Sequence, residues 1–145
     1  MSVPGVTTNG GFDEYRLSKY TGLFKLPDDI SYKTSAFTEP FACAVNGMKK
    51  LDIEPGQFVT IFGPGPMGQM MVRMAKSIGA GKIALIGTRD YRLEMGKKNG
   101  ADFIFNTKDE NSKYYVVDLK EAISDLTDGK LTDRAIVPTS SNDAF

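Results

Sequence analysis

The sequence predicts an α/β protein of the Rossmann type, in which helices cover a doubly wound parallel sheet. Short apolar segments alternate with amphipathic segments between Gln57 and Pro138, an order that indicates right-handed crossovers and parallel strands. The apolar segments are nearly unbroken, as in strands buried on both faces. A glycine-rich turn follows the first apolar segment and leads directly into a helix, which is the arrangement of a dinucleotide-binding unit.

The N-terminal third of the chain is predicted to hold two short strands and a helix. Weak alternation of apolar residues indicates strands at 12–18 and 23–27. The helix is expected to begin near Glu39 and Pro40, because proline suits a first helical turn, and to end between Leu51 and Glu54. Its apolar face recurs at helical spacing and consists of Phe41, Ala44, Val45, Met48 and Leu51.

The rest of the chain is predicted to alternate strands and helices. Strands are expected at 58–62, 82–86, 102–106 and 134–138. The first helix between them ends at Gly79, the second stops at Gly100, and the third starts near Val116 and ends before Gly129. The core face of the first helix is expected to be Met67, Met70, Met71, Met74, Ala75 and Ile78. A full dinucleotide fold needs two further strands, so the predicted sheet is incomplete and stops after its fourth strand.

Composition excludes several classes of function. Acidic and basic residues balance at 18 each, so the net charge favours neither nucleic acid nor an anionic membrane as a partner. We expect neither a membrane span nor a signal peptide in this sequence, and its single cysteine, Cys43, fits a reducing compartment, so we expect a cytoplasmic protein. Histidine is absent, which excludes hydrolytic triads that use it, and we identify no catalytic side chain in this chain.

Gly63, Gly65 and Gly68 form the motif G-x-G-x-x-G between a predicted strand and a predicted helix. In such turns the first glycine allows the sharp turn, the second lets the backbone approach a pyrophosphate, and the third lets helix and strand pack closely. Pro66 presets the first helical turn, and the free N–H groups from Gly65 to Gly68, Met67 included, would hold the anion. The alternative is a glycine-rich turn that binds no nucleotide.

The end of the second strand predicts which nicotinamide cofactor is preferred. Binders of NAD place Asp or Glu there, whereas this chain has Gly87, which would leave room for a 2′-phosphate. Thr88 can donate to a phosphate oxygen, Arg89 can pair with the phosphate through its planar fork, and Arg92 can add charge. We therefore predict NADP rather than NAD, with Asp90 at the start of the next helix. The alternative for Arg89 is a solvated surface arginine.

The succession of motifs resembles the medium-chain dehydrogenase/reductase family. The segments "GGFDEY", "KLPDDIS", "EPFACAVNGM", "IEPGQFVTIFGPGPMGQMMVRMAKSIGA" and "NGADFIFN" occur in the family's order, and they are similar to those of zinc-dependent alcohol, polyol and threonine dehydrogenases. The resemblance implies that residues 1–35 are the tail end of a chaperonin-10-like catalytic domain. It also implies that residues 36–145 are a Rossmann domain, truncated after its fourth strand.

The resemblance also implies an activity, which is hydride transfer between the nicotinamide and a secondary alcohol or polyol, with zinc as the Lewis acid. Glu39 matches the family's acid at the catalytic zinc; its alternative is an acidic first-turn residue that interacts with the helix dipole. Cys43 is expected in the core. The family's other zinc ligands belong upstream, so we expect this chain alone to be inactive.

Three functions remain open. The leading one is the cofactor-binding part of an NADP-preferring, zinc-dependent alcohol dehydrogenase, which acts on a small alcohol or carbonyl compound and forms a dimer or tetramer when full length. A zinc-free quinone or enoyl reductase of the same superfamily is the second. A non-catalytic module that senses NADPH is the third, since no catalytic group is evident.

Overall fold

The structure is a computed structural model, and it describes residues 5, 7–10, 12 and 14–139. The chain divides into two compact units, Met1–Ser35 and Ala36–Phe145. Each unit is described by itself below.

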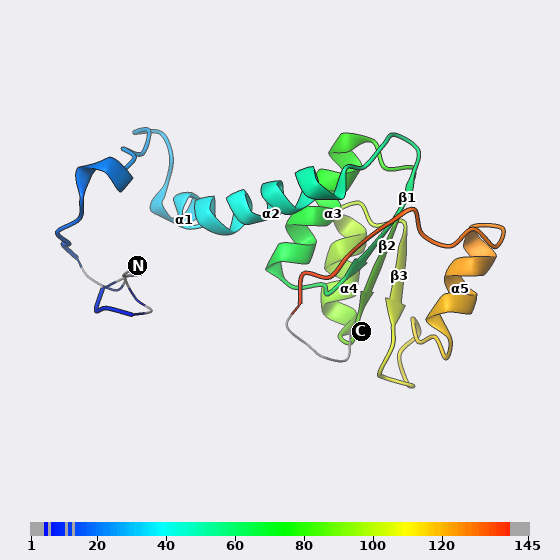
Figure 1. Ribbon diagram of the computed structural model, residues 1–145. Helices are drawn as coiled ribbons and strands as arrows, with labels where there is room; N and C mark the ends of the chain where they lie inside the picture. Colours follow the sequence, from blue (N-terminus) through cyan, green and yellow to red (C-terminus); the bar gives the residue numbers. More distant parts are fainter. Residues whose placement is uncertain (1–4, 6, 11, 13, 140–145) are drawn as a thin grey trace. The chain divides into compact units, whose positions relative to one another are not determined.

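The first unit contains two short helical segments and no strand pairing at the predicted positions (Figure 1). These are the 3-10 helix η1 (Tyr20–Gly22) and the single turn α1 (Tyr32–Ser35). The predicted strands at 12–18 and 23–27 are therefore wrong for the described residues. Side chains such as Leu17 and Phe24 are almost fully exposed, and a strand forms only where a neighbouring strand pairs with its backbone groups.

The second unit is an α/β sandwich around a four-stranded parallel sheet, which confirms the predicted fold class. The strands lie in the order β3-β2-β1-β4, so the chain moves outward from β1 in one direction and then returns to the other side of β1. The elements in chain order are α2 (Thr38–Leu51), β1 (Phe58–Phe62), α3 (Pro66–Ile78), β2 (Lys82–Gly87), α4 (Asp90–Lys98), β3 (Phe103–Asn106), α5 (Leu119–Leu126) and β4 (Arg134–Ile136).

Both faces of the sheet are covered, as Figure 1 shows, with α3 and α4 on one face and α5 on the other. Successive strand residues point to opposite faces. Ile83 and Leu85 belong to the core under α2, α3 and α4, whereas Ala84 and Ile86 belong to the core under α5. Two-sided burial is why the strand segments are apolar at nearly every position.

Helix ends agree with most of the predictions. Gly79 ends α3 in the left-handed region, with φ of 102°, and Pro66 occupies the first turn of that helix. The last helix begins later than predicted: Val116 lies outside it, and its N–H donates to the Asn106 carbonyl. The Asp118 carboxylate instead caps α5 by accepting from the Glu121 N–H at 3.0 Å.

Two residues expected in the core are exposed. Ile78, the last residue of α3, is 41% exposed. Cys43 is exposed on α2, whereas Ala44 and Met48 on the same helix are buried. The methionines of α3 do pack on the core: Met71 is buried, and its neighbours Met67, Met70 and Met74 contact the core cluster.

Within the part of the chain that the structure describes, no helix is long and apolar enough to cross a bilayer.

Candidate functional site

A cleft of about 760 Å3 opens at the carboxyl ends of the strands. In open parallel sheets this edge, at the point where the strand order reverses, is where ligands bind. Residues from the ends of all four strands or from the segments that follow them reach the cleft: Phe62, Gly63, Pro64, Gly65, Ile86, Gly87, Thr88, Arg89, Arg92, Thr107, Lys108, Leu119, Pro138 and Thr139.

The first and third glycines of the motif are required by the protein itself. Gly63 has φ of 115°, a conformation that favours glycine, and its N–H donates to the Ile86 carbonyl at 2.9 Å. Gly68 is buried in the first turn of α3, and a Cβ there would collide with the carbonyl oxygen of Gly63. These two glycines allow α3 to pack closely against the end of β1.

Gly65 differs from the other two, because nothing in the described part of the chain requires a glycine there. Its φ of −74° and ψ of −177° suit any residue, and a Cβ on it would project into open space. Gly65 borders the cleft and directly precedes α3, whose first N–H groups have no acceptor within the helix. The missing side chain therefore leaves the backbone open to a ligand in the cleft.

The three residues after Gly65 do not line the cleft. Pro66 is exposed at the first helical position, Met67 packs against the core, and Gly68 is buried beneath the turn. Their predicted part in cofactor binding would therefore be limited to backbone groups and to the shape of the turn.

Gly87 lines the cleft, and packing gives a reason for the glycine in addition to the predicted one. We expected Gly87 to leave room for a phosphate. The residue is buried, and a Cβ on it would collide with the Pro64 ring and lie 3.4 Å from Leu93 Cδ2. Pro64 thus fills the space in which a side chain at position 87 would begin, and no carboxylate can stand there without displacement of Pro64.

Arg89 and Arg92 both line the cleft, on either side of Tyr91 in the sequence. The Arg92 Nε donates to the Tyr91 hydroxyl oxygen at 2.8 Å. Hydrogen bonding from Arg89 and then from Arg92 lowers the pKa of Tyr91, because both guanidinium groups favour the phenolate. In the described part of the chain, no carboxylate lies within ion-pair distance of either arginine. Their charge is therefore available to an anionic ligand.

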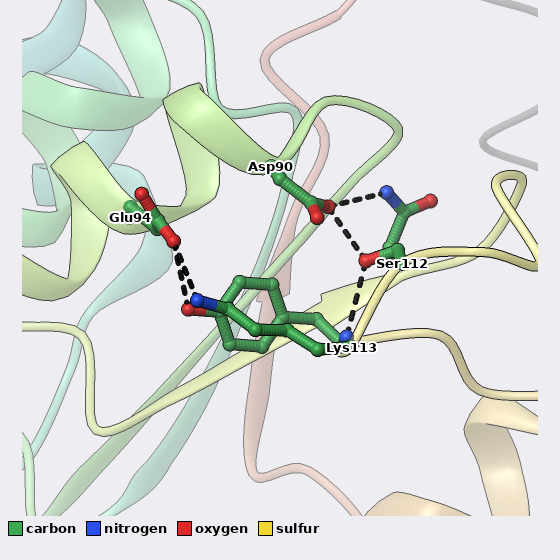
Figure 2. Close-up of polar contacts among 6 residues, drawn as sticks. Asp90, Glu94, Ser112 and Lys113 are labelled. Atoms are coloured by element: carbon green, nitrogen blue, oxygen red, sulfur yellow. Dashed lines mark hydrogen bonds and ion pairs between the residues drawn. The ribbon is translucent and has the colours of Figure 1, made fainter.

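Asp90 begins α4 between these arginines, but its carboxylate is turned to a different set of partners (Figure 2). Its Oδ1 accepts from the Ser112 hydroxyl at 2.6 Å and from the Asn106 Nδ2 at 2.8 Å. These hydrogen bonds, Ser112 first, lower the pKa of Asp90. Asp90 does not line the cleft, and it is a first-turn residue of α4, as predicted.

Gln69 connects the glycine turn to the arginine-bearing helix. Its Nε2 donates to the carbonyl oxygens of Pro64, at 3.0 Å, and Arg92, at 2.8 Å. Its Oε1 accepts from the Asn99 Nδ2 at 2.8 Å. The Gln69 side chain therefore fixes the distance between the glycine turn and the arginine-bearing first turn of α4.

Sequence reasoning missed the wall of the cleft that follows β3. Thr107 and Lys108 come directly after this strand and line the cleft. A signal was present, because residues just beyond the carboxyl ends of parallel strands share one edge of the sheet. Pro64, Pro138 and Thr139 were missed for the same reason, as they follow β1 and β4.

A metal site is not assembled from the described residues. The Glu39 Oε1 accepts a hydrogen bond from Cys43 Sγ at 3.3 Å on the exposed face of α2, and this carboxylate is the main reason that the pKa of Cys43 is raised. A zinc site needs at least three protein ligands, and no cluster of three His, Cys, Asp or Glu side chains occurs among the described residues. Glu39 could supply one ligand, and others would have to come from elsewhere.

Comparison with solved structures supports the same arrangement. The chain resembles a structure described as a short-chain alcohol dehydrogenase from Escherichia coli CFT073 in complex with NADH, with a TM-score of 0.77 and 25% identity over 97% of this chain and 39% of that one. It also resembles the alcohol dehydrogenase TADH from Thermus sp. ATN1, with a TM-score of 0.70 and 26% identity over 83% of this chain and 33% of that one.

Curated relatives are more similar in sequence. D-arabitol-phosphate dehydrogenase from Enterococcus avium is 37% identical over 90% of this chain and 36% of its own length. Sorbitol dehydrogenase from Bacillus subtilis is 35% identical over 72% of this chain and 30% of its own length. The chain thus spans about a third of the length of the relatives it matches.

The family model described as zinc-binding dehydrogenase matches residues 66–145, from the first turn of α3 onward. This match covers the arginine-bearing turn, the segment after β3 and the final strand, so it includes most walls of the cleft. With a parallel sheet in the order β3-β2-β1-β4 and a glycine turn at its edge, the chain belongs to the zinc-binding dehydrogenases, a family of oxidoreductases within the medium-chain dehydrogenase/reductase group.

Proposed function

We propose that the chain is the cofactor-binding part of an NADP-preferring, zinc-dependent alcohol or polyol dehydrogenase. The observation that carries the proposal is Gly65, a glycine that neither its backbone conformation nor its neighbours require, at the edge of the cleft. A ligand that approaches the backbone closely explains its presence. A pyrophosphate fits this position, because the first N–H groups of α3 and the helix dipole favour an anion there.

The preference for NADP is supported by the charge of the neighbouring wall. Arg89 and Arg92 line the cleft without a carboxylate partner in the described chain. A 2′-phosphate carries a charge of about −1.5 to −2 at neutral pH, and it can pair with the planar fork of a guanidinium. The acid that would accept from a ribose 2′-hydroxyl is absent at Gly87, and Asp90 is held away by Ser112 and Asn106. Thr88, exposed at the rim, would donate a further hydrogen bond.

In the proposed reaction, an alcohol carbon transfers a hydride to C4 of the nicotinamide, and the alcohol proton leaves to give a carbonyl compound. A bound zinc ion would polarise the substrate oxygen. In this chain, Glu39 would contribute one ligand at most, and the cleft would hold the adenosine and pyrophosphate parts of the cofactor. The relatives named for sorbitol and arabitol phosphate favour a polyol or a related alcohol as the substrate.

Two further functions are kept. A zinc-free reductase of the same superfamily would use the same cleft, and zinc analysis of a protein with the relatives' full length separates it from the leading proposal. A module that only senses NADPH would bind the cofactor equally well, and it would show no turnover in such a protein. Assembly into dimers or tetramers is proposed from the family resemblance alone.

The test is titration of the chain with NADPH and NADH. We expect NADPH to bind more tightly, and Arg89→Ala to weaken NADPH by on the order of tenfold to a hundredfold, because a hydrogen bond to a charged group contributes about 1.5–3 kcal/mol. Binding of NADH should change little. Arg73→Ala is the control, since Arg73 is an exposed arginine of α3 outside the cleft. Equal binding of both cofactors to the wild type would defeat the NADP assignment.

A further inference from the structure

The segment between β3 and α5 is fastened to α4 by buried and half-buried polar side chains (Figure 2). Asn106, the last residue of β3, is fully buried. Its Nδ2 donates to the Asp90 carboxylate at 2.8 Å, and its Oδ1 accepts from the N–H groups of Lys108 and Asp109, each at 3.0 Å. One amide therefore links the arginine-bearing turn at the start of α4 to the backbone of Lys108.

The same segment is held at two further points. The Ser112 hydroxyl donates to Asp90 Oδ1 and accepts from the Tyr114 N–H at 3.0 Å. One helical turn along α4, Glu94 Oε1 accepts from the Tyr114 hydroxyl and pairs with Lys113 Nζ, each at 3.0 Å. Figure 2 shows both carboxylates of α4 facing this segment. The position of the segment relative to α4 is thus fixed at several places.

Lys108 is the cationic residue that this arrangement presents to the cleft. Its side chain is exposed and lines the cleft together with Arg89 and Arg92. No carboxylate of the described chain lies within ion-pair distance of it. Its neighbour Asp109 is engaged locally, because its Oδ1 accepts from the Asn111 N–H at 3.1 Å. Lys108 is thus an unpaired cation on the wall of the cleft that follows β3.

We propose that Lys108 is a third cationic contact to the phosphate bound by Arg89 and Arg92, and that the Asn106–Asp90 contact is what positions it. The proposal rests on the proposed NADP site and adds a determinant of cofactor selectivity from the segment after β3. A phosphate monoester has three outer oxygens and about two negative charges. Two arginines on one wall and a lysine on another would surround it from two sides. Anchoring the lysine backbone in advance lowers the cost of ordering that wall when the ligand binds.

The first experiment compares Lys108→Gln with the wild type in titrations with NADPH and NADH. We expect NADPH to bind about 1.4- to fivefold more weakly, as for one exposed charge pair, and NADH to bind unchanged. Lys98→Gln is the matched control, because Lys98 is an exposed lysine at the far end of α4 that does not line the cleft. An unchanged ratio of the two affinities in Lys108→Gln would overturn the proposal.

The positioning role is tested with Asn106→Ala in a double-mutant cycle with Lys108→Gln. If Asn106 acts through Lys108, Asn106→Ala lowers the preference for NADPH, and adding Lys108→Gln lowers it no further. A purely structural role would weaken both cofactors alike and leave their ratio unchanged, which would refute the role. If Asn106→Ala fails to fold by circular dichroism, Ser112→Ala removes one hydrogen bond to Asp90 and takes its place in the same cycle.

The outcomes for the two proposals are distinct. Loss of NADPH preference in Arg89→Ala with no change in Lys108→Gln leaves the NADP site standing and rejects the third contact. Equal affinities of the wild type for NADPH and NADH reject both.

Discussion

At the scale of single residues, Pro64 and Gly87 share one volume at the base of the cleft. A Cβ on Gly87 would collide with the Pro64 ring, so the identity of position 87 depends on position 64. From the sequence, the absence of an acid at position 87 is interpreted as a preference for NADP over NAD. The structure adds a packing constraint, because an acid at position 87 requires Pro64 to shift or to be replaced by a smaller residue.

This dependence predicts a coupled pair of substitutions. Gly87→Asp should lower the free energy of unfolding by about 1–3 kcal/mol, the usual cost of overpacking. Pro64→Ala should remove most of that cost, and the double variant should favour NADH over NADPH, because a carboxylate would then stand beside the ribose. Urea denaturation of both single variants and the double variant measures the coupling. If the changes in unfolding free energy of the two single variants simply add up to that of the double variant, positions 64 and 87 do not compete for the same space.

Asp90 predicts how stability depends on pH. Hydrogen bonds from Ser112 and Asn106 hold its pKa below the ordinary value, so its contribution to stability is present above the unfolded-state pKa, about 3.9. That contribution is lost as the pH falls through the lower pKa of the folded state. The difference in unfolding free energy between wild type and Asp90→Asn should therefore shrink as the pH is lowered from about 6 to about 3. A difference that is constant over this range would show that the carboxylate charge plays no part.

At the scale of elements, the turn between β1 and α3 uses chemically identical residues for different purposes. Gly63 is required by its backbone angle, Gly68 by the nearby carbonyl of Gly63, and Gly65 by neither. Two of the three motif glycines are therefore needed to form the turn, and the third leaves the backbone accessible to a ligand. This division allows folding and binding to be separated by substitution.

Gly65→Ala and Gly68→Ala should have opposite effects. Gly65→Ala should preserve the free energy of unfolding or raise it by about 0.4–1 kcal/mol, because the backbone conformation suits alanine, while weakening NADPH and NADH alike by about tenfold or more. Gly68→Ala should destabilise the fold by about 1–3 kcal/mol, because backbone blocks its Cβ. Thermal unfolding with and without cofactor measures both effects. Unimpaired binding in a folded Gly65→Ala variant would remove the main support for the pyrophosphate site.

At the scale of the whole molecule, the features that depend on local periodicity could be predicted from the sequence. The features that depend on contacts between distant residues could not. The parallel sheet followed from unbroken apolar segments, and the cleft edge followed from the glycine motif, since both signals lie within short stretches. The described residues form no strands at 12–18 and 23–27, because alternation of apolar residues does not by itself provide a pairing partner. Cys43 is exposed because it lies off the apolar face of α2, which holds the buried Ala44 and Met48.

The candidate site was predicted in part for the same reason. Arg89 and Arg92 follow the glycine motif at a recognisable interval, whereas Lys108 reaches the cleft only through the parallel register of β3 with β2. The buried contact of Asn106 with Asp90 joins residues 16 positions apart. Such contacts appear only once the strands are placed side by side.

The last strand has a consequence for how the protein acquires its function. β4 pairs with β1, and the Asp133 carboxylate just before β4 accepts from the Phe58 N–H across 75 residues of chain. Loops of that length close late, because their entropy is lost before any contact compensates for it. Gly63 adjoins Pro138 and Thr139, which follow β4. The wall of the cleft beside the glycine turn is therefore complete only after β4 has paired with β1. The wall formed by Pro138 and Thr139 would then be completed last, so an early folding intermediate with β1 to β3 in place would hold the glycine turn and both arginines but only part of the cleft.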